Sequence, residues 1–257
     1  MLQIAGITPH PPIIVPGVGS EKDLTKVAST TDSMTKMAKS LHEKDVDTVV
    51  IITPHGLLSD EFSVYSSDRF TSSLPGALLN FDGDPEIADR ICKIKDAKKV
   101  EDGKLDHGTS VPMYFFQKIN PKLKVVPVAY SSKDRGDHFQ FGKSLFNKLN
   151  KQQEKTAIIA SGDLSHKLKP SAPAGFSKEG KKFDKELIKL LKNKKEEEVI
   201  KMDEDLIEEA GQCGYRSIVT LLGALSQTDY NVEVLSYEGP FGVGYGVLRY
   251  NIENDEN

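Results

Sequence analysis

Short runs of β-branched residues alternate with longer amphipathic stretches along this 257-residue chain, and this alternation limits the fold more than any other feature. The pattern is typical of a sheet flanked by helices. We expect strands at 3–8, 48–53, 123–129, 156–160, 232–236 and 244–250. We expect helices at 23–44, 85–95, 111–118, 137–150, 178–192, 195–202 and 212–225. The sequence therefore predicts a single α/β domain over residues 1–257, with a frayed tail at 253–257.

Composition and charge narrow the class of protein. Hydrophobic residues make up 38% of the chain and charged residues 28%, which is typical of a folded globular protein. The net charge of −4 provides no basic face for a phosphate backbone, so we expect no nucleic-acid partner. A homodimer is the default expectation for a chain of this size.

The cysteines and the N-terminal segment indicate the compartment. Cys92 and Cys213 lie far apart and form no Cys-x-x-Cys motif, which favours a reducing environment. The first residues carry no basic leader, and no apolar run approaches the roughly 20 residues that span a bilayer. We therefore expect a cytoplasmic protein without a membrane partner.

Three of the six histidines follow predicted strands. His10 and His55 each end a Thr-Pro-His sequence, and His166 follows the strand at 156–160. If these strands are parallel, the three side chains meet at the carboxyl edge of the sheet, where α/β proteins bind ligands. One loop histidine alone is more often a polar surface residue. Three together, two of them on proline-stiffened turns, favour a metal site.

Other residues extend this candidate site. His107 lies in Asp-His-Gly-Thr-Ser before a predicted helix, where it either reaches the same crevice or remains a loop residue. The segment 161–166 lacks a nucleophile elbow, so we interpret His166 as an acid/base group that Asp163 orients. His42 and His138 lie among charged residues, and we expect both at the surface.

Cys213 is a candidate third ligand. It lies near the start of the last predicted helix, where the helix dipole favours a thiolate, although a lone cysteine is more often a small buried residue. We assign Cys92 to that second category. The glycines at 237–246 do not connect a strand to a helix, so they predict a hairpin loop and not a dinucleotide site.

Five motifs together resemble the class III extradiol dioxygenases, the LigB-type superfamily with its Memo-like relatives. They are Thr8-Pro-His-Pro-Pro, Thr53-Pro-His-Gly, Asp106-His-Gly-Thr-Ser-Val-Pro, Gly162-Asp-Leu-Ser-His and Glu209-Ala-Gly-Gln-Cys-Gly. They occur in order over nearly the whole chain, which looks closest to the domains of the AmmeMemoRadiSam systems. The resemblance implies a central mixed, mostly parallel sheet with helices on both faces and a metal site at one end.

The resemblance also implies roles for individual residues. His10 and His55 match the metal-binding histidines, His166 the acid/base histidine, and His107 the histidine near the substrate. In ring-cleaving members, a non-haem Fe(II) held by two His and one Glu binds a catechol and O2. The expected partners are therefore an aromatic diol and O2, and the expected cofactor is Fe(II).

The chain departs from this family at the third ligand, because Cys213 occupies the position of the glutamate. A thiolate favours softer ions, so Zn or Cu becomes an alternative to Fe(II). Two other functions stay open: a Memo-like non-catalytic protein that binds a metal or a partner, and a metal-dependent hydrolase with His166 as base. A nearby carboxylate is the alternative third ligand, from Glu208, Glu209 or Glu238.

Overall fold

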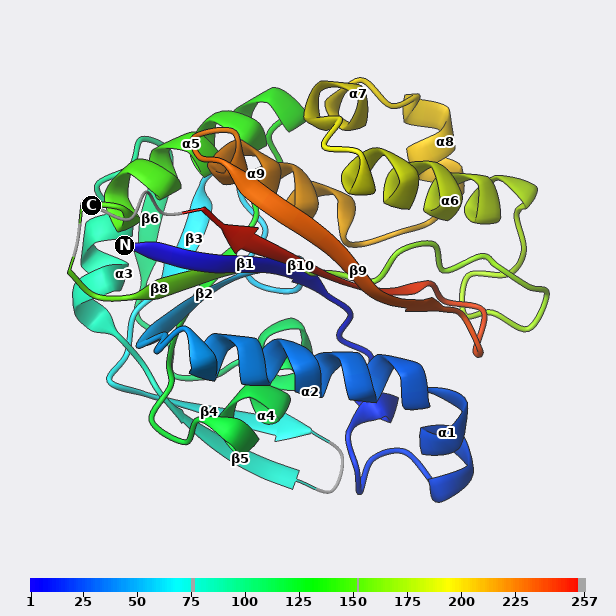
Figure 1. Ribbon diagram of the computed structural model, residues 1–257, viewed down its shortest axis with the longest axis horizontal. Helices are drawn as coiled ribbons and strands as arrows, with labels where there is room; N and C mark the ends of the chain where they lie inside the picture. Colours follow the sequence, from blue (N-terminus) through cyan, green and yellow to red (C-terminus); the bar gives the residue numbers. More distant parts are fainter. Residues whose placement is uncertain (75–76, 152, 254–257) are drawn as a thin grey trace.

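A sheet of eight strands forms the centre of the structure, a computed structural model that describes residues 1–74, 77–151 and 153–253. The strands lie side by side in the order β6-β3-β7-β2-β8-β1-β10-β9 (Figure 1). Their bounds are β1 Leu2–Thr8, β2 Thr48–Thr53, β3 Phe62–Tyr65, β6 Ala97–Val100, β7 Lys124–Ala129, β8 Thr156–Ser161, β9 Tyr230–Glu238 and β10 Tyr245–Ile252.

The central strands are parallel, and this arrangement defines a functional edge. β7, β2, β8 and β1 pair in parallel, whereas β10 pairs antiparallel with both β1 and β9. At the other side, β3 is antiparallel to β7 and parallel to β6. Every residue of β2 and β8 is buried, as expected for strands covered on both faces. The sheet is mixed and mostly parallel, so the carboxyl ends of four strands meet at one edge.

Helices and a hairpin complete the architecture. The helices are α1 Glu21–Lys26, α2 Ala28–Glu43, α3 Pro85–Ile91, α4 His107–Ile119, α5 Arg135–Leu149, α6 Lys178–Lys192, α7 Glu196–Ile200, α8 Glu204–Glu209 and α9 Tyr215–Leu225. The hairpin strands are β4 Arg69–Leu74 and β5 Ala77–Asp82.

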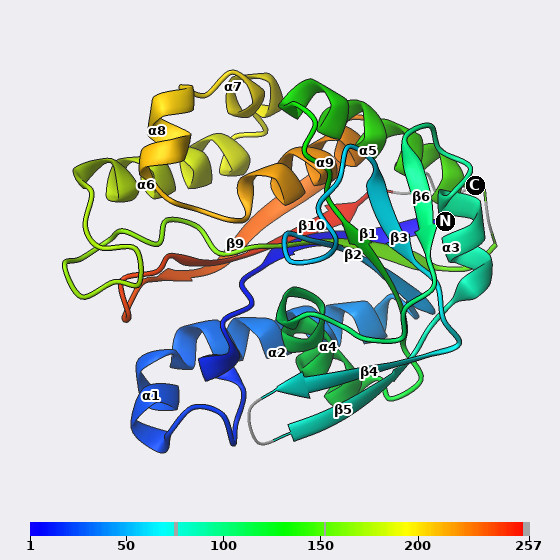
Figure 2. The same ribbon diagram turned by 180° about the vertical axis from the view of Figure 1, so that it is seen from behind.

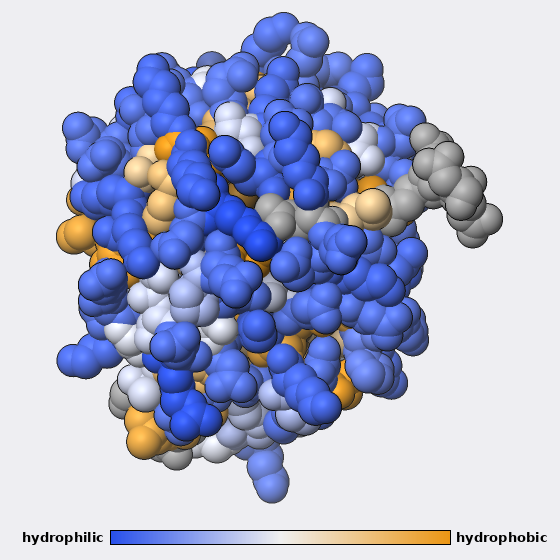
Figure 3. All heavy atoms as spheres, turned by 90° about the vertical axis from the view of Figure 1, so that its left-hand side faces the viewer, coloured by the Kyte–Doolittle hydropathy of each residue, from blue (hydrophilic) through white to orange (hydrophobic). Residues whose placement is uncertain are grey.

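The helices cover both faces of the sheet, as predicted. α2 and α4 lie on one face with the β4–β5 hairpin, and α3, α5, α6 and α9 lie on the other (Figures 1 and 2). Each face has its own hydrophobic core. Hydrophilic residues cover most of the face at the amino ends of the parallel strands (Figure 3).

The six predicted strands and the hairpin between the last two are confirmed, with small shifts at their ends. Four strands, β3 to β6, and the short α8 were not predicted. β6 reads Ala-Lys-Lys-Val and β4 reads Arg-Phe-Thr-Ser-Ser-Leu, so neither has the apolar run that marks a core strand. The prediction of one helix at 23–44 was wrong in detail, because Val27 separates α1 from α2. The tail at 254–257 lies outside the described residues.

The placement of one histidine at the surface was wrong. His138 is fully buried on α5, where Nδ1 lies 2.7 Å from the carbonyl oxygen of Asp134. Its ring packs against Phe62 and Tyr130, with centroid distances of 5.0 and 5.9 Å. The charged neighbours in sequence lie on the outer face of α5, whereas His138 faces the sheet. His42 is exposed, as predicted.

Two further expectations can be compared with the structure. Cys92 is half-buried and packs against the core, in agreement with its assignment as a small apolar residue. Within the described ranges, no helix combines the length and the apolar character that crossing a bilayer requires.

Candidate metal centre

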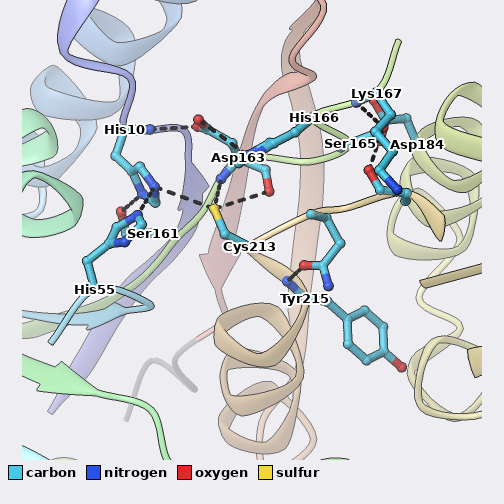
Figure 4. Close-up of polar contacts among 12 residues, drawn as sticks. His10, His55, Ser161, Asp163, Ser165, His166, Lys167, Asp184, Cys213 and Tyr215 are labelled. Carbon is cyan, nitrogen blue, oxygen red and sulfur yellow. Dashed lines mark hydrogen bonds and ion pairs between the residues drawn. The ribbon is translucent and has the colours of Figure 1, made fainter. Parts of the chain in front are cut away.

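Three candidate metal-ligand side chains meet at the carboxyl edge of the sheet. His10 follows β1, His55 follows β2, and Cys213 immediately precedes the N-cap residue of α9 (Figure 4). The Nε2 atoms of the two histidines are 3.0 Å apart, and Sγ of Cys213 lies 3.5 Å from Nε2 of His10. All three donor atoms lie within 4.8 Å of one another. The topology thus brings together the three residues that the sequence nominated as ligands.

The tautomer of His10 is fixed by a serine at the end of β8. The hydroxyl of Ser161 donates its proton to the carbonyl oxygen of Gly108 at 2.5 Å. It must therefore accept the 2.9 Å hydrogen bond that joins it to Nδ1 of His10. Nδ1 then carries the ring proton, and Nε2 presents a bare lone pair towards Cys213 and His55. This is the arrangement that metal-binding histidines require.

Asp163 connects the histidine to the cysteine. Its Oδ1 accepts a hydrogen bond from the backbone amide of His10 at 3.0 Å. Its own amide donates to Sγ of Cys213 at 3.3 Å, and its carbonyl oxygen accepts from the amide of Gly214 at 3.0 Å. Asp163 is buried, with 6% of the residue exposed, and this burial raises the pKa of its carboxyl group to about 7. Asp163 therefore positions both candidate ligands and can hold a proton near neutral pH.

Two glycines allow the segment after β8 to touch the start of α9. A Cβ atom on Gly162 would lie 2.1 Å from Cα of Gly214, and a Cβ on Gly214 would lie 3.0 Å from the Asp163 carbonyl oxygen. Only residues without side chains permit this approach. The contact brings Cys213 to within reach of His10.

His55 and His107 form the exposed side of the cluster. Their ring centroids are 4.0 Å apart, with a tilt of 32°. His107 is the first residue of α4, which begins four residues earlier than predicted because the side chain of Asp106 caps the amide of Thr109. Burial, followed by the nearby charge of His107, lowers the pKa of His55 to about 4. His55 is therefore neutral at physiological pH, as a ligand must be.

His166 lies next to the cluster and has an unused nitrogen. Its Nε2 is buried without a hydrogen-bond partner among the described residues and lies 3.9 Å from Oδ2 of Asp163. Burial lowers the pKa of His166 below its usual value, so its ring is neutral near pH 7. A neutral imidazole with a free nitrogen can accept a proton from a bound molecule.

The thiol of Cys213 behaves differently from the sequence-based expectation. The helix position is as predicted, but burial, and then the charge of Asp163, raise the pKa of the thiol. The helix dipole therefore does not make Cys213 a thiolate in the protein alone. A cation bound between the donor atoms would supply the missing positive charge.

The carboxylates proposed as alternative ligands lie elsewhere. Glu208 and Glu209 are exposed on α8. Oε1 of Glu238 accepts hydrogen bonds from the amide and the hydroxyl of Thr30, at 2.7 and 2.5 Å. Among the described residues, the candidate ligand group therefore contains Cys213 and no glutamate.

Sequence analysis missed several residues at this site. Ser161 was not predicted as a site residue, although its position directly after the predicted strand at 156–160 was an available signal. Tyr130 and Arg216 line a cavity of about 480 Å³ next to Cys213. Tyr130 directly follows β7, the fourth parallel strand of this edge. The same rule that nominated the histidines would have nominated Tyr130.

A comparison of the sequence with models of known protein families identifies the family of this chain. The model of the catalytic LigB subunit of aromatic ring-opening dioxygenase matches residues 5–248. The chain belongs to the LigB family. The family predicted from the five motifs is thus confirmed, whereas the AmmeMemoRadiSam-associated branch remains a prediction. At the family level, membership indicates an oxygenase-like, metal-dependent type of enzyme.

Relatives of this LigB-family chain extend the comparison. Protein CA_C1420 of Clostridium acetobutylicum is 34% identical over 263 aligned residues, which cover 95% of this chain and 56% of the relative. The chain thus spans about half the length of that relative. The 3,4-dihydroxyphenylacetate 2,3-dioxygenase of Escherichia coli is 25% identical, over 80% of this chain and 83% of the enzyme. An uncharacterized protein of Escherichia coli K12, JW3007, shares the fold, with a TM-score of 0.66 and 14% identity over 96% of this chain and 99% of that one.

Proposed function

We propose that this chain is a metal-dependent oxygenase of the extradiol ring-cleavage type, with His10, His55 and Cys213 as the metal ligands. The observation that carries the proposal is the convergence of these three donor atoms within 4.8 Å. The chain's membership of the LigB family and its similarity to a 3,4-dihydroxyphenylacetate 2,3-dioxygenase support the same class of reaction. The substrate class is an aromatic vicinal diol.

The donor set fits a divalent metal. Nε2 of His10 is bare because Nδ1 is bonded to Ser161, and the amide of Asp163 donates to the sulfur of Cys213. Hydrogen bonds of this kind orient ligands and stabilise their metal-binding forms. Two neutral imidazoles and one anionic ligand suit Fe(II), whereas the thiolate also suits Zn or Cu. We propose Fe(II) for the oxygenase.

A metal held by His10, His55 and Cys213 would supply Lewis-acid activation of a diol and O2. The chain's own residues would then control protons and orientation. Nε2 of His166 would accept a proton from a diol hydroxyl group, and Oδ2 of Asp163 would stabilise the resulting imidazolium from 3.9 Å. His107, whose ring lies 5.3 Å from that of His10, would contact the substrate beside the ligands.

One observation favours a second candidate function. Cys213 gives the site a soft ligand, and zinc binds both Cys and His in catalytic sites where three protein ligands leave a fourth position open. In that case a metal-bound water replaces O2, and His166 serves as the base of a hydrolase. A Memo-like role in binding a metal or a partner without catalysis is the third alternative.

Metal content and oxygen uptake test these functions. The protein would be purified anaerobically, analysed for bound metals, and studied by the electron paramagnetic resonance signal of its Fe(II)–nitric oxide adduct with a panel of catechols. Stoichiometric iron, a signal that changes with a catechol, and catechol-dependent O2 uptake support the oxygenase. Bound zinc with ester or amide hydrolysis supports the hydrolase instead. A metal-loaded protein without turnover of either kind supports the partner-binding role. His10→Ala is the control that should lose the metal.

A further inference from the structure

A cavity of about 480 Å³ lies beside the metal-binding cluster and shares Cys213 with it. The loop before α9, the first turn of α9, α8 and the start of α5 form its wall. Tyr130, Tyr215 and Ile207 are among the lining residues, and the half-exposed ring of Tyr130 provides aromatic surface beside Cys213. A cavity of this size with such a wall can accept an aromatic ring.

Arg216 is an unpaired cation in this wall. It is the one residue of α9 that is not buried, and its guanidinium lies over the ring of Tyr130 at 5.6 Å from the centroid. Among the described residues, Arg216 has no carboxylate within ion-pair distance. The other guanidinium of the cavity, Arg135, is occupied by the Ile200 and Met202 carbonyl oxygens at 2.9 and 2.7 Å and by Glu204 at 3.1 Å. Arg216 is therefore the guanidinium available to a ligand.

The start of α9 strengthens this positive region. The first-turn amides of a helix lack partners within the helix and carry partial positive charge. In α9, the amide of Tyr215 is used by the side chain of Gln212 at 2.7 Å, and the amide of Ile218 bonds to Gly214. Among the described residues, the amides of Arg216 and Ser217, in the same turn as the guanidinium, donate no hydrogen bond to a residue outside the helix.

The remaining charges of the wall limit the charge of the ligand. Three acidic residues line the cavity, namely Asp134, Glu204 and Glu208. Asp134 caps α5 through the amide of Asp137, Glu204 pairs with Arg135, and Glu208 is exposed. They would repel a dianion or a longer acidic chain more strongly than a single carboxylate. The wall thus favours a monoanion that reaches Arg216.

We infer that this cavity is the substrate subsite and that Arg216 selects a substrate that carries a carboxylate group on its aromatic ring or side chain. The inference rests on the proposed diol-binding function and deepens it. The diol would face the cluster at Cys213, the ring would lie against the aromatic wall, and the carboxylate would pair with the guanidinium three residues further along the chain. Nothing in the five sequence motifs nominates Arg216 for this role.

Paired ligands test the inference. Fe(II)-loaded protein, kept free of O2 so that the oxygenase reaction cannot proceed, would be titrated by calorimetry with 3,4-dihydroxyphenylacetate and with its neutral methyl ester. A charge-assisted hydrogen bond predicts a preference of about 10- to 100-fold for the acid in the wild type. Arg216→Gln should abolish the preference and leave the affinity for the ester unchanged, and Arg216→Lys should retain part of it. Lys143→Gln is the matched control, because Lys143 also lies over an aromatic ring, that of Phe139 at 5.2 Å, but lines another cavity.

The outcomes separate this inference from the proposed function. Equal affinity of the wild type for acid and ester, or an unchanged preference in Arg216→Gln, overturns the role of Arg216 while diol binding stands. If neither catechol binds, the proposed function fails, and phenylacetate titrated into metal-free protein then decides the inference. Saturation-transfer NMR should detect phenylacetate on the wild type and not on Arg216→Gln. If phenylacetate binds to neither protein, or binds equally to the wild type and to Arg216→Gln, the role of Arg216 is overturned.

Discussion

The hydroxyl of Ser161 lies 2.9 Å from Nδ1 of His10 and donates its own proton to Gly108, so the serine holds the histidine in its metal-binding tautomer. Ser161→Ala removes this acceptor and frees the ring. Loss of such a supporting contact lowers metal affinity by about 10- to 100-fold. Competition with a chromogenic chelator would measure the zinc dissociation constant of both proteins.

Thr156→Val is the control for the serine variant. It removes another buried hydroxyl from β8, at the end of the strand away from the cluster, where Oγ1 has no hydrogen-bond partner among the described residues. We expect its zinc affinity to equal that of the wild type. An unchanged affinity in Ser161→Ala would contradict the role of the serine.

Loss of a metal ligand and loss of the proton-transfer group should have different effects on metal content and on kcat. His10→Ala and His55→Ala should abolish stoichiometric metal binding, because each removes one of the three converging donor atoms. His166→Ala should keep the metal and lower kcat, by about 10²- to 10⁴-fold if its imidazole is the general base. Metal analysis and oxygen uptake measured on the same samples check this. A His10→Ala protein with full metal content would rule out the proposed ligand set.

The decrease of kcat/KM on the acidic side of its pH profile should reflect protonation of His166. Its neutral ring is the active form, and burial lowers its pKa below 6.5, so more of the ring stays neutral as the pH falls. We expect kcat/KM to be flat through neutral pH and to decrease only at pH values below 6.5. In His166→Gln this decrease should disappear from the residual activity. A wild-type profile that already falls above pH 7 would assign the essential base to another group.

Much of the site was predictable because it depends on topology. His10 and His55 follow apolar strands that the sequence marks clearly, and parallel pairing then brings them together. The position of Cys213 came from the motif at 209–214, since nothing local shows that two glycines let α9 approach β8. Ser161 contacts His10 from 151 residues away, and Arg216 contacts Tyr130 from 86 residues away. Such pairings have no local signal.

The unpredicted parts of the fold have a common cause. β3 and β6 have only four residues each, β4 is mostly polar, and all four strands lie at the sheet margin or in a separate hairpin. Edge elements need less apolar surface than central strands, so their hydrophobic periodicity is weak. His138 was misplaced for a different reason. Its neighbours in sequence are charged, but α5 still buries one face, and His138 lies on that face.

The contact between Gly162 and Gly214 should be sensitive to a single methyl group. Gly162→Ala would place a Cβ 2.1 Å from Cα of Gly214, so the two segments must separate. We expect a loss of about 1–3 kcal/mol in the free energy of unfolding, together with weaker metal binding. Urea denaturation and metal titration measure the two effects. Gly136→Ala, in the first turn of α5, adds the same methyl group 3.1 Å from a side-chain oxygen of Asp134 and against no backbone atom, so it should weaken neither stability nor metal binding.

A buried carboxylate away from the cluster should make stability depend on pH. Asp184 on α6 is fully buried, with Oδ1 accepting from the amide of Ser165 at 2.8 Å and Oδ2 from the hydroxyl of Tyr237 at 2.6 Å. Burial raises its pKa from 3.8 to about 6. The folded protein therefore binds this proton more tightly than the unfolded chain, so the free energy of unfolding falls as the pH rises from about 4 to about 6.

Asp184→Asn removes this titration while keeping the shape of the side chain. A shift from 3.8 to about 6 corresponds to about 3 kcal/mol, which the wild type should lose over that pH range and the variant should retain. Urea denaturation of both proteins at pH 4, 5, 6 and 7 gives the difference at each pH. Asp163 titrates in both proteins, so its contribution cancels when the two free energies of unfolding are subtracted. Any pH-independent effect of the amide on stability changes this difference by the same amount at all four pH values. A difference that does not change with pH would show that Asp184 ionises normally in the folded protein.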